Sequence, residues 1–200
     1  MAVNADNALI FSSDDDSLWL TDYDKDFATK VTGLTSDLTS VAGLTNVGWL
    51  HEDGVKLAFD DSLTKIKGHQ GHGVVKTFLD SSESSISATL LETLLKPLTW
   101  YLDATAEKVE ETKAGGGGEK INVAKITAKS SRKVKVLSGV ADLFDVSGVG
   151  AHVRIVFSRL ELGERGEITF QQAEITGYEF NLSILGDYII YSDHKALIPA

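Results

Sequence analysis

Strict alternation of apolar and polar residues in the second half of the chain constrains its fold more than any other feature. The clearest run spans residues 178–184, where tyrosine, phenylalanine, leucine and isoleucine alternate with glutamate, asparagine and serine. A period of two residues places all the apolar side chains on one face of a β-strand. Shorter runs at 55–59, 86–90 and 153–157, separated by turns that contain glycine, predict a mainly β fold of the sandwich or barrel type.

The length of 200 residues suits a single domain, and 42% hydrophobic with 24% charged residues is a globular composition. The absence of cysteine excludes disulfides, thiolate metal sites and a cysteine nucleophile. No apolar run in the chain as given approaches the roughly 18 residues of a membrane-spanning helix, so we expect no contact with a membrane.

The organisation along the chain predicts an arm followed by one domain. Residues 1–47 sustain neither a helical nor a strand period, which indicates an extended N-terminal arm, and residues 48–200 form a single β-sandwich domain. Leucines at helical spacing predict one short flanking helix at about 93–103, with Thr93 as its N-cap. The charged stretch at about 107–119, which ends in four glycines, predicts a flexible loop.

Charge is distributed unevenly. The net charge of −10 disfavours a nucleic-acid-binding protein, because such proteins neutralise phosphates with clustered lysine and arginine. Residues 1–61 hold 12 acidic and 3 basic residues, whereas residues 120–135 hold six basic residues and no acidic one. These stretches are either solvated surfaces or complementary contacts between copies of the chain. On the second interpretation the inter-subunit residues are Leu18, Trp19, Leu20, Leu34, Leu38 and Leu44 of the arm, with Lys129, Arg132 and Lys133.

The search for chemistry predicts no catalytic, metal or cofactor site. Asp22, Asp24 and Asp26 imitate the start of a calcium loop, but the glycine and glutamate that such a loop needs are missing. His69 and His72 have no third ligand in a recognisable pattern. Since no nucleophile, acid–base pair or ligand cluster can be assembled, we expect a structural or binding protein rather than an enzyme.

A set of segments in a fixed order resembles the major tail protein of long-tailed, non-contractile phages, especially those of actinobacteria. The resemblance covers roughly residues 48–187. Its segments in the first half are Gly48-Trp-Leu-His-Glu-Asp-Gly-Val55, Ile66-Lys-Gly-His-Gln-Gly71, Val74-Val-Lys-Thr77 and Thr89-Leu-Leu-Glu92. Those in the second half are Val153-Arg-Ile-Val156, Glu164-Arg-Gly-Glu-Ile168, Gly177-Tyr-Glu-Phe-Asn-Leu182 and Leu185-Gly-Asp187.

The resemblance implies a virion structural protein of the tail tube, with a β-sandwich fold and no cofactor. Six copies would close a ring, and stacked rings would form the conduit through which DNA passes transiently and without sequence specificity. It further implies assembly in the bacterial host cytoplasm, a location in the phage tail, and a tape-measure protein and tail-end proteins as partners. A tail terminator is a neighbouring role in the same structural class.

Two rival functions come from other classes. Three tryptophans suggest a carbohydrate- or receptor-binding β-sandwich module, and a small β-barrel enzyme with an unseen site is the second rival. For Trp49, at a strand entrance, and Trp100, in the predicted helix, we expect packing in the core instead, because both positions are ordinary places for a buried ring.

Overall fold

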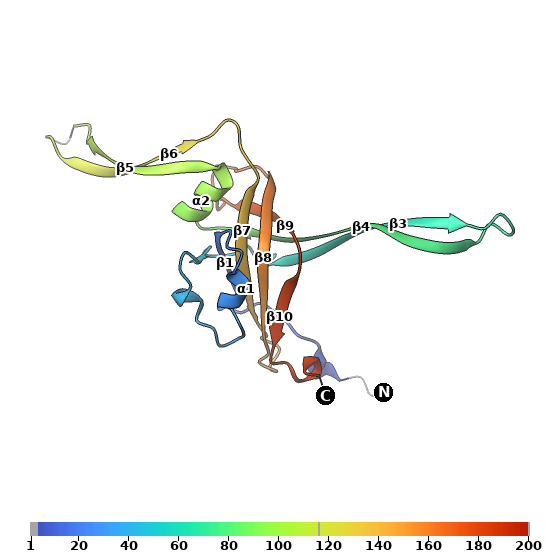
Figure 1. The fold of residues 1–200 in the computed structure, drawn as a ribbon. Coiled ribbons are helices and arrows are strands. Elements are labelled where there is room, and N and C mark those ends of the chain that lie inside the picture. Colours follow the sequence, from blue (N-terminus) through green and yellow to red (C-terminus); the bar gives the residue numbers. More distant parts are fainter. Residues whose placement is uncertain (1–3, 116, 200) are drawn as a thin grey trace.

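The computed structural model describes residues 4–115 and 117–199 and is mainly β (Figure 1). The described residues form ten strands, two α-helices and three 3-10 helices. In chain order these are η1 (Ala5–Asn7), β1 (Ser17–Asp22), α1 (Phe27–Lys30), η2 (Leu38–Ser40), β2 (Thr45–Asn46), β3 (Lys56–Lys67), β4 (Val74–Leu90), α2 (Leu95–Leu102), β5 (Ala104–Thr112), β6 (Lys120–Ala128), β7 (Lys135–Phe144), β8 (His152–Arg165), β9 (Tyr178–Ile184), β10 (Tyr188–Ser192) and η3 (Lys195–Leu197).

One large antiparallel sheet forms the body. Among the described residues it holds eight strands, in the order β2-β1-β7-β8-β9-β4-β3, and β10 pairs with β8. Strand β8 pairs with β10 over Val153–Phe157 and with β9 over Leu160–Arg165, while β7 lies along its other edge. Strands β5 and β6 form a separate two-stranded sheet. The mainly β prediction is therefore confirmed.

The first face of the sheet carries the main core. The apolar residues of β9 are buried in strict alternation, as their sequence period requires. Helix α2 covers them, and its Tyr101 ring lies 5.3 Å from Phe180 and 6.0 Å from Tyr178, measured between ring centroids. Burial of each large apolar side chain stabilises the fold by about 1.5–3 kcal/mol. The helix predicted at 93–103 is confirmed as α2, but its N-cap residue is Leu94, and Thr93 instead hydrogen-bonds the Tyr178 hydroxyl at 2.9 Å.

The second face of the sheet is covered by the chain between β1 and β2. Phe27, Val31 and Leu38 are buried there against Val140 of β7 and Val156 of β8. This segment thus contributes its own hydrophobic cluster, on the side of the sheet opposite α2.

The predicted extended N-terminal arm is wrong. Strand β1 pairs with both β2 and β7, and its Leu18 and Leu20 are fully buried in the main core. Its Trp19 packs on the second cluster, so both faces of β1 are covered by apolar neighbours. A short strand covered on both faces shows no alternation, which explains why its period is absent from the sequence.

The predicted loop at 107–119 is also wrong over its first half. Residues up to Thr112 belong to β5, and only the connection that follows is a turn region. The register places Glu107 opposite Lys125, and opposite charges on facing strand positions stabilise a pair of strands that glutamate and lysine would otherwise disfavour.

Two hairpins project from the body in opposite directions (Figure 1). The long hairpin comprises residues 58–83 of β3, β4 and their turn, and the short hairpin comprises residues 104–128 of β5, β6 and their turn. The body strands β7 and β8 run across the direction of both hairpins, and the terminal elements η1 and η3 lie together at one end of these strands.

Candidate interaction surfaces

The long hairpin projects from the body and is exposed to solvent. In the long hairpin every strand residue of 58–67 and 74–83 is exposed. Its exposed large apolar side chains include Phe59 (60% exposed), Val75 (73%) and Leu79 (58%). An isolated two-stranded hairpin in water is marginally stable at best, and scattered apolar side chains on both strands would gain from being covered.

The edges of the long hairpin are also open. Strand β3 ends the strand order of the sheet, so its outer edge has no strand partner within the described residues. Strand β4 pairs with β9 only from Ser84 to Leu90, which leaves the edge over 74–83 unpaired in the described structure. Such edges present rows of N–H and C=O groups that can pair with another strand.

The short hairpin is held by opposite charges. Lys125 lies 2.6 Å from Glu107 and Lys120 lies 3.0 Å from Glu110, both measured between side-chain nitrogen and oxygen. Between this hairpin and the start of α2 lies an apolar hollow of about 240 Å³, lined in part by Leu95 and by the small side chains of Ala106 and Ala124.

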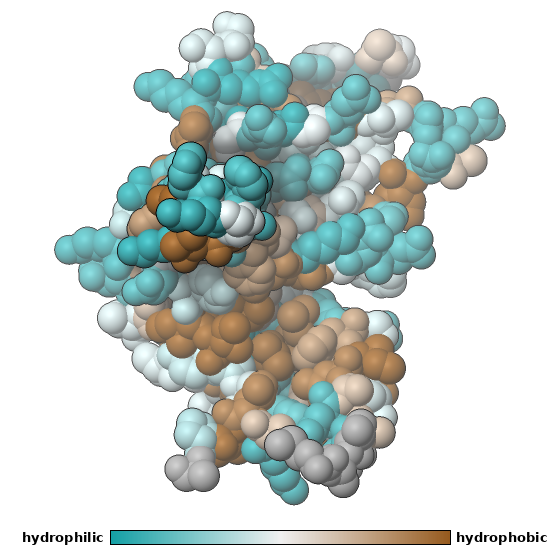
Figure 2. Space-filling model, turned by 90° about the vertical axis from the view of Figure 1, so that its right-hand side faces the viewer, coloured by the Kyte–Doolittle hydropathy of each residue, from teal (hydrophilic) through white to brown (hydrophobic). Residues whose placement is uncertain are grey.

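A third exposed surface, near the chain ends, lies at the end of the molecule where η1 and η3 are found. Figure 2 views the molecule from the side to which the long hairpin projects and shows apolar side chains gathered in its lower part. Three segments meet here, because Val146 N–H donates to the Ile10 carbonyl and Asp193 N–H donates to the His152 carbonyl. The exposed apolar residues of these segments are Ile10, Phe11, Val146, Val149, Leu197 and Ile198.

Two acidic side chains at the borders of the body hold separate segments together. Asp145 accepts hydrogen bonds from Ile10 N–H at 2.8 Å and from Gly150 N–H at 3.1 Å, as well as from both the backbone and the hydroxyl of Ser147. Burial alone would raise the pKa of Asp145, but these donors outweigh it and hold the pKa well below its usual range. Asp22 accepts from Trp100 and pairs with Lys96 and Lys135, so it joins β1, α2 and β7.

A buried ion pair fixes the segment on the second face. Arg154 and Asp142, each about 5% exposed, form a double hydrogen bond at 2.7 and 2.6 Å. The same guanidinium donates to the carbonyls of Gly33 and Ser36 at 2.9 and 2.8 Å. All these contacts are internal, so the pair is structural.

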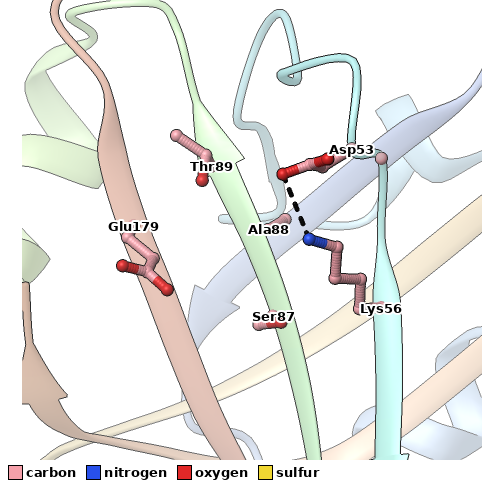
Figure 3. Close-up of a pocket in the computed structure, with 7 residues that line it drawn as sticks. Asp53, Lys56, Ser87, Ala88, Thr89 and Glu179 are labelled. Atoms are coloured by element: carbon pink, nitrogen blue, oxygen red, sulfur yellow. Dashed lines mark ion pairs between the residues drawn. The ribbon is translucent and has the colours of Figure 1, made fainter.

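The polar hollow in Figure 3 does not offer a catalytic arrangement. It has a volume of about 230 Å³, below the roughly 300–1,000 Å³ of most ligand pockets. Ser87, Thr89 and Glu179 point into it from β4 and β9, and Lys56 forms an ion pair with Asp53 at 3.1 Å. That pair holds the pKa of Asp53 below its usual value. No histidine is among the residues that line the hollow.

The motifs considered for metal binding lie apart from one another. His69 and His72 are exposed in the turn of the long hairpin. Asp24 forms an ion pair with Lys30, which together with backbone hydrogen bonding lowers the pKa of that carboxyl. Within residues 4–115 and 117–199, no group of three or more histidine, aspartate or glutamate side chains is placed to hold a metal ion.

Three of the six predicted interface residues of the N-terminal segment are not free to meet a second copy. Leu18, Leu20 and Leu38 are buried within the chain's own clusters, so their assignment to an inter-subunit surface is wrong. Trp19, Leu34 and Leu44 are half-buried, and Trp19 and Leu44 pack on the second cluster.

The predicted basic interface residues are exposed. Lys129 lies 3.8 Å from Asp103, while Lys120, Lys125 and Lys135 also pair with carboxylates of the same chain. Arg132 and Lys133 are exposed nearby. Burial, and then the nearby charge of Arg132, lower the pKa of the Arg165 guanidinium. Much of the basic stretch therefore neutralises acids of its own chain.

The tryptophans divide between core and surface. Trp100 is buried as predicted, and its indole N–H donates to Asp22 at 3.1 Å. The prediction of core packing is wrong for Trp49, which is 75% exposed, although its backbone N–H is held by Glu92 at 2.9 Å.

Comparison with known proteins adds no family assignment. No protein-family model matches the chain, and no curated protein matches it at a significant level. In the part of the chain that the structure describes, no helix is both long and apolar enough to cross a membrane.

Proposed function

We propose that this protein is a self-assembling structural subunit of the phage tail tube, in which copies form rings and the rings stack into a conduit for DNA. The observation that carries the proposal is the long hairpin, which extends beyond the core with exposed strands, exposed apolar side chains and open edges. A lone copy gains little from such an element, whereas a neighbouring copy can cover it.

The arrangement of surfaces suits an assembly that continues from copy to copy. The two hairpins point in opposite directions, and the apolar surface at the chain ends lies on a third side. Contacts between different surfaces of one chain are head-to-tail, so they close into a ring or propagate into a filament, according to the rotation between neighbours.

The net charge of −10 is compatible with a DNA conduit. A wall that attracted phosphates would retain the passing DNA, whereas an acidic wall leaves it mobile. The resemblance of residues 48–187 to major tail proteins supports this version of the assembly, with the virion as its location and a tape-measure protein and tail-end proteins as partners.

A carbohydrate- or receptor-binding module is the second candidate, favoured by the exposed ring of Trp49. Such rings stack on sugars, but this function leaves the long hairpin without a role. A module of this kind is expected to remain monomeric.

Negative-stain microscopy and sedimentation of concentrated full-length protein test the proposal. We expect tubes or stacked rings, with a sedimentable fraction that rises with protein concentration. A protein that remains monomeric at every concentration and ionic strength would contradict the proposal and favour the binding module.

A further inference from the structure

Charge is segregated along the long hairpin. Its outer part, residues 62–79, carries Lys65, Lys67 and Lys76 and no acidic residue. Its inner part, residues 58–61 and 80–83, carries four acidic residues and no basic one: Asp60, Asp61, Asp80 and Glu83. We refer to these as the basic tip and the acidic base of the long hairpin.

The acidic base lacks internal compensation. The register places Asp60 directly opposite Glu83, and like charges that face each other across two strands are destabilising. Asp80 accepts only the hydroxyl hydrogen bond of Thr64, at 2.6 Å, among the contacts that the structure records for it. A basic side chain brought from outside would relieve this repulsion.

The basic tip is likewise open to an incoming acid. The three lysines are exposed, and Lys76 lies over the Phe78 ring at 5.0 Å from its centroid. Six residues separate Asp60 from Ile66, the β3 residue opposite Lys76, which corresponds to roughly 20 Å along the strand. Lys76 is therefore too far from Asp60 to form an ion pair with it inside one hairpin.

We propose that the long hairpin pairs edge to edge with the long hairpin of a second copy, displaced along the strands so that the basic tip of one lies on the acidic base of the other. This inference rests on the proposed function and adds the partner surface and its register. The outer edge of β3 and the edge of β4 over 74–83 are both open, so one hairpin can pair with a copy on each side.

Charge selects this displaced register over the unshifted one. Two hairpins aligned without displacement would place base on base and tip on tip, which is repulsive at both ends. Complementary potentials set the register of an interface in this way.

A nucleic-acid role for the tip is the competing interpretation. Three lysines beside four acids form a poor phosphate-binding surface, because affinity for DNA scales with the number of phosphates neutralised. The pairing of hairpins accounts for both charge groups, whereas DNA binding accounts for the tip alone.

Charge reversal with complementation tests the pairing. A tip variant carries Lys65→Glu, Lys67→Glu and Lys76→Glu, and a base variant carries Asp60→Lys, Asp61→Lys and Glu83→Lys. We expect each variant alone to lose its sedimentable fraction by about tenfold or more under conditions in which the unmodified protein assembles. An equimolar mixture should restore it, because every tip then finds a base of opposite charge.

A control variant reverses Lys25 and Lys30, two exposed lysines outside both the long hairpin and the apolar surface near the chain ends, and should assemble like the unmodified protein. Circular dichroism should show that all variants are folded, since the changed residues are exposed. Normal assembly of either hairpin variant alone, or no recovery in the mixture, would overturn the pairing while leaving the proposed function intact. Loss of DNA retention in a gel by the tip variant, with unaffected assembly, would also overturn it. Failure of the unmodified protein to assemble would count against the proposed function itself.

Discussion

Arg154 shows how strongly one buried side chain can fix a segment that lacks regular structure. Its guanidinium satisfies Asp142 within the sheet and two carbonyls of the segment that covers the second face. The charge pair lies in a place where water cannot replace a missing partner, so its loss is more costly than that of a surface pair.

For Arg154→Met we therefore expect a loss at the lower end of about 3–5 kcal/mol in the free energy of unfolding, because the buried Asp142 loses its charged partner and keeps only the His152 ring nitrogen, at 2.8 Å, among its side-chain partners. Lys113→Met is the matched control, since Lys113 pairs with Glu119 at 3.4 Å in an exposed turn and should contribute only about 0–1 kcal/mol. Urea unfolding monitored by fluorescence measures both. Equal effects of the two substitutions would show that the guanidinium does not hold the segment.

Asp145 predicts a pH dependence. Its pKa in the folded protein is held below the value of about 3.9 for an unperturbed aspartate, so its ionised form contributes stability at neutral pH. That contribution starts to decline below about pH 4 and disappears as the pH falls through the folded pKa. In Asp145→Asn we expect a shallower fall in unfolding free energy between pH 5 and pH 3. An unchanged slope would assign the acid sensitivity to other carboxylates, such as Asp22.

At the scale of elements, the sequence predicts the strands and helices that bury one face and expose the other. The alternation at 178–184 and the leucine spacing at 93–103 become β9 and α2, because each packs one side against the core and leaves the other in water. Strand β1 could not be found in this way, since Leu18 and Trp19 point to different hydrophobic clusters. When both faces of a strand are buried, apolar residues occupy successive positions and no alternation is visible in the sequence.

The long hairpin could not be predicted from the sequence for a different reason. The runs at 55–59 and 86–90 predict two short strands, yet the second run is only the last part of strand β4, which begins at Val74. The serines and acids at 80–85 have weak strand preference and interrupt the alternation. Their strand conformation depends on pairing with β3, and the charge separation along the hairpin becomes visible only when this register is known.

Shortening the long hairpin should separate assembly from folding. In a variant that replaces residues 63–80 by Asn-Gly, the paired Ser62 and Ser81 would flank a two-residue turn. We expect the melting temperature to stay within a few degrees, because all the removed strand residues are exposed, while the sedimentable fraction is lost. Replacement of turn residues 68–73 alone by Asn-Gly is the control and should retain assembly. Tubes formed by the shortened variant would refute a role for this hairpin.

At the scale of the whole molecule, the chain combines a fully packed core with large apolar surfaces that are exposed to solvent. The N-terminal segment belongs to the packed core, since it supplies β1 and the residues that cover the second face of the sheet. The projecting hairpins and the apolar surface near the chain ends are the exposed surfaces. Under the proposed function, folding depends on the buried residues and assembly depends on these exposed surfaces.

Removal of residues 1–47 tests this division, and we expect it to abolish folding rather than assembly alone. The deletion takes Leu18 and Leu20 from the main core and Phe27, Val31 and Leu38 from the second cluster, all of them buried. At about 1.5–3 kcal/mol for each side chain, the loss is on the order of 10 kcal/mol, comparable with the 5–15 kcal/mol that stabilises a typical domain. Circular dichroism and thermal melting should show no cooperative transition for residues 48–200. Removal of residues 1–8 is the control, which should melt like the full chain because the described side chains there are exposed. A cooperative transition for 48–200 at the temperature of the full chain would mean that β1 and the second cluster are dispensable for folding.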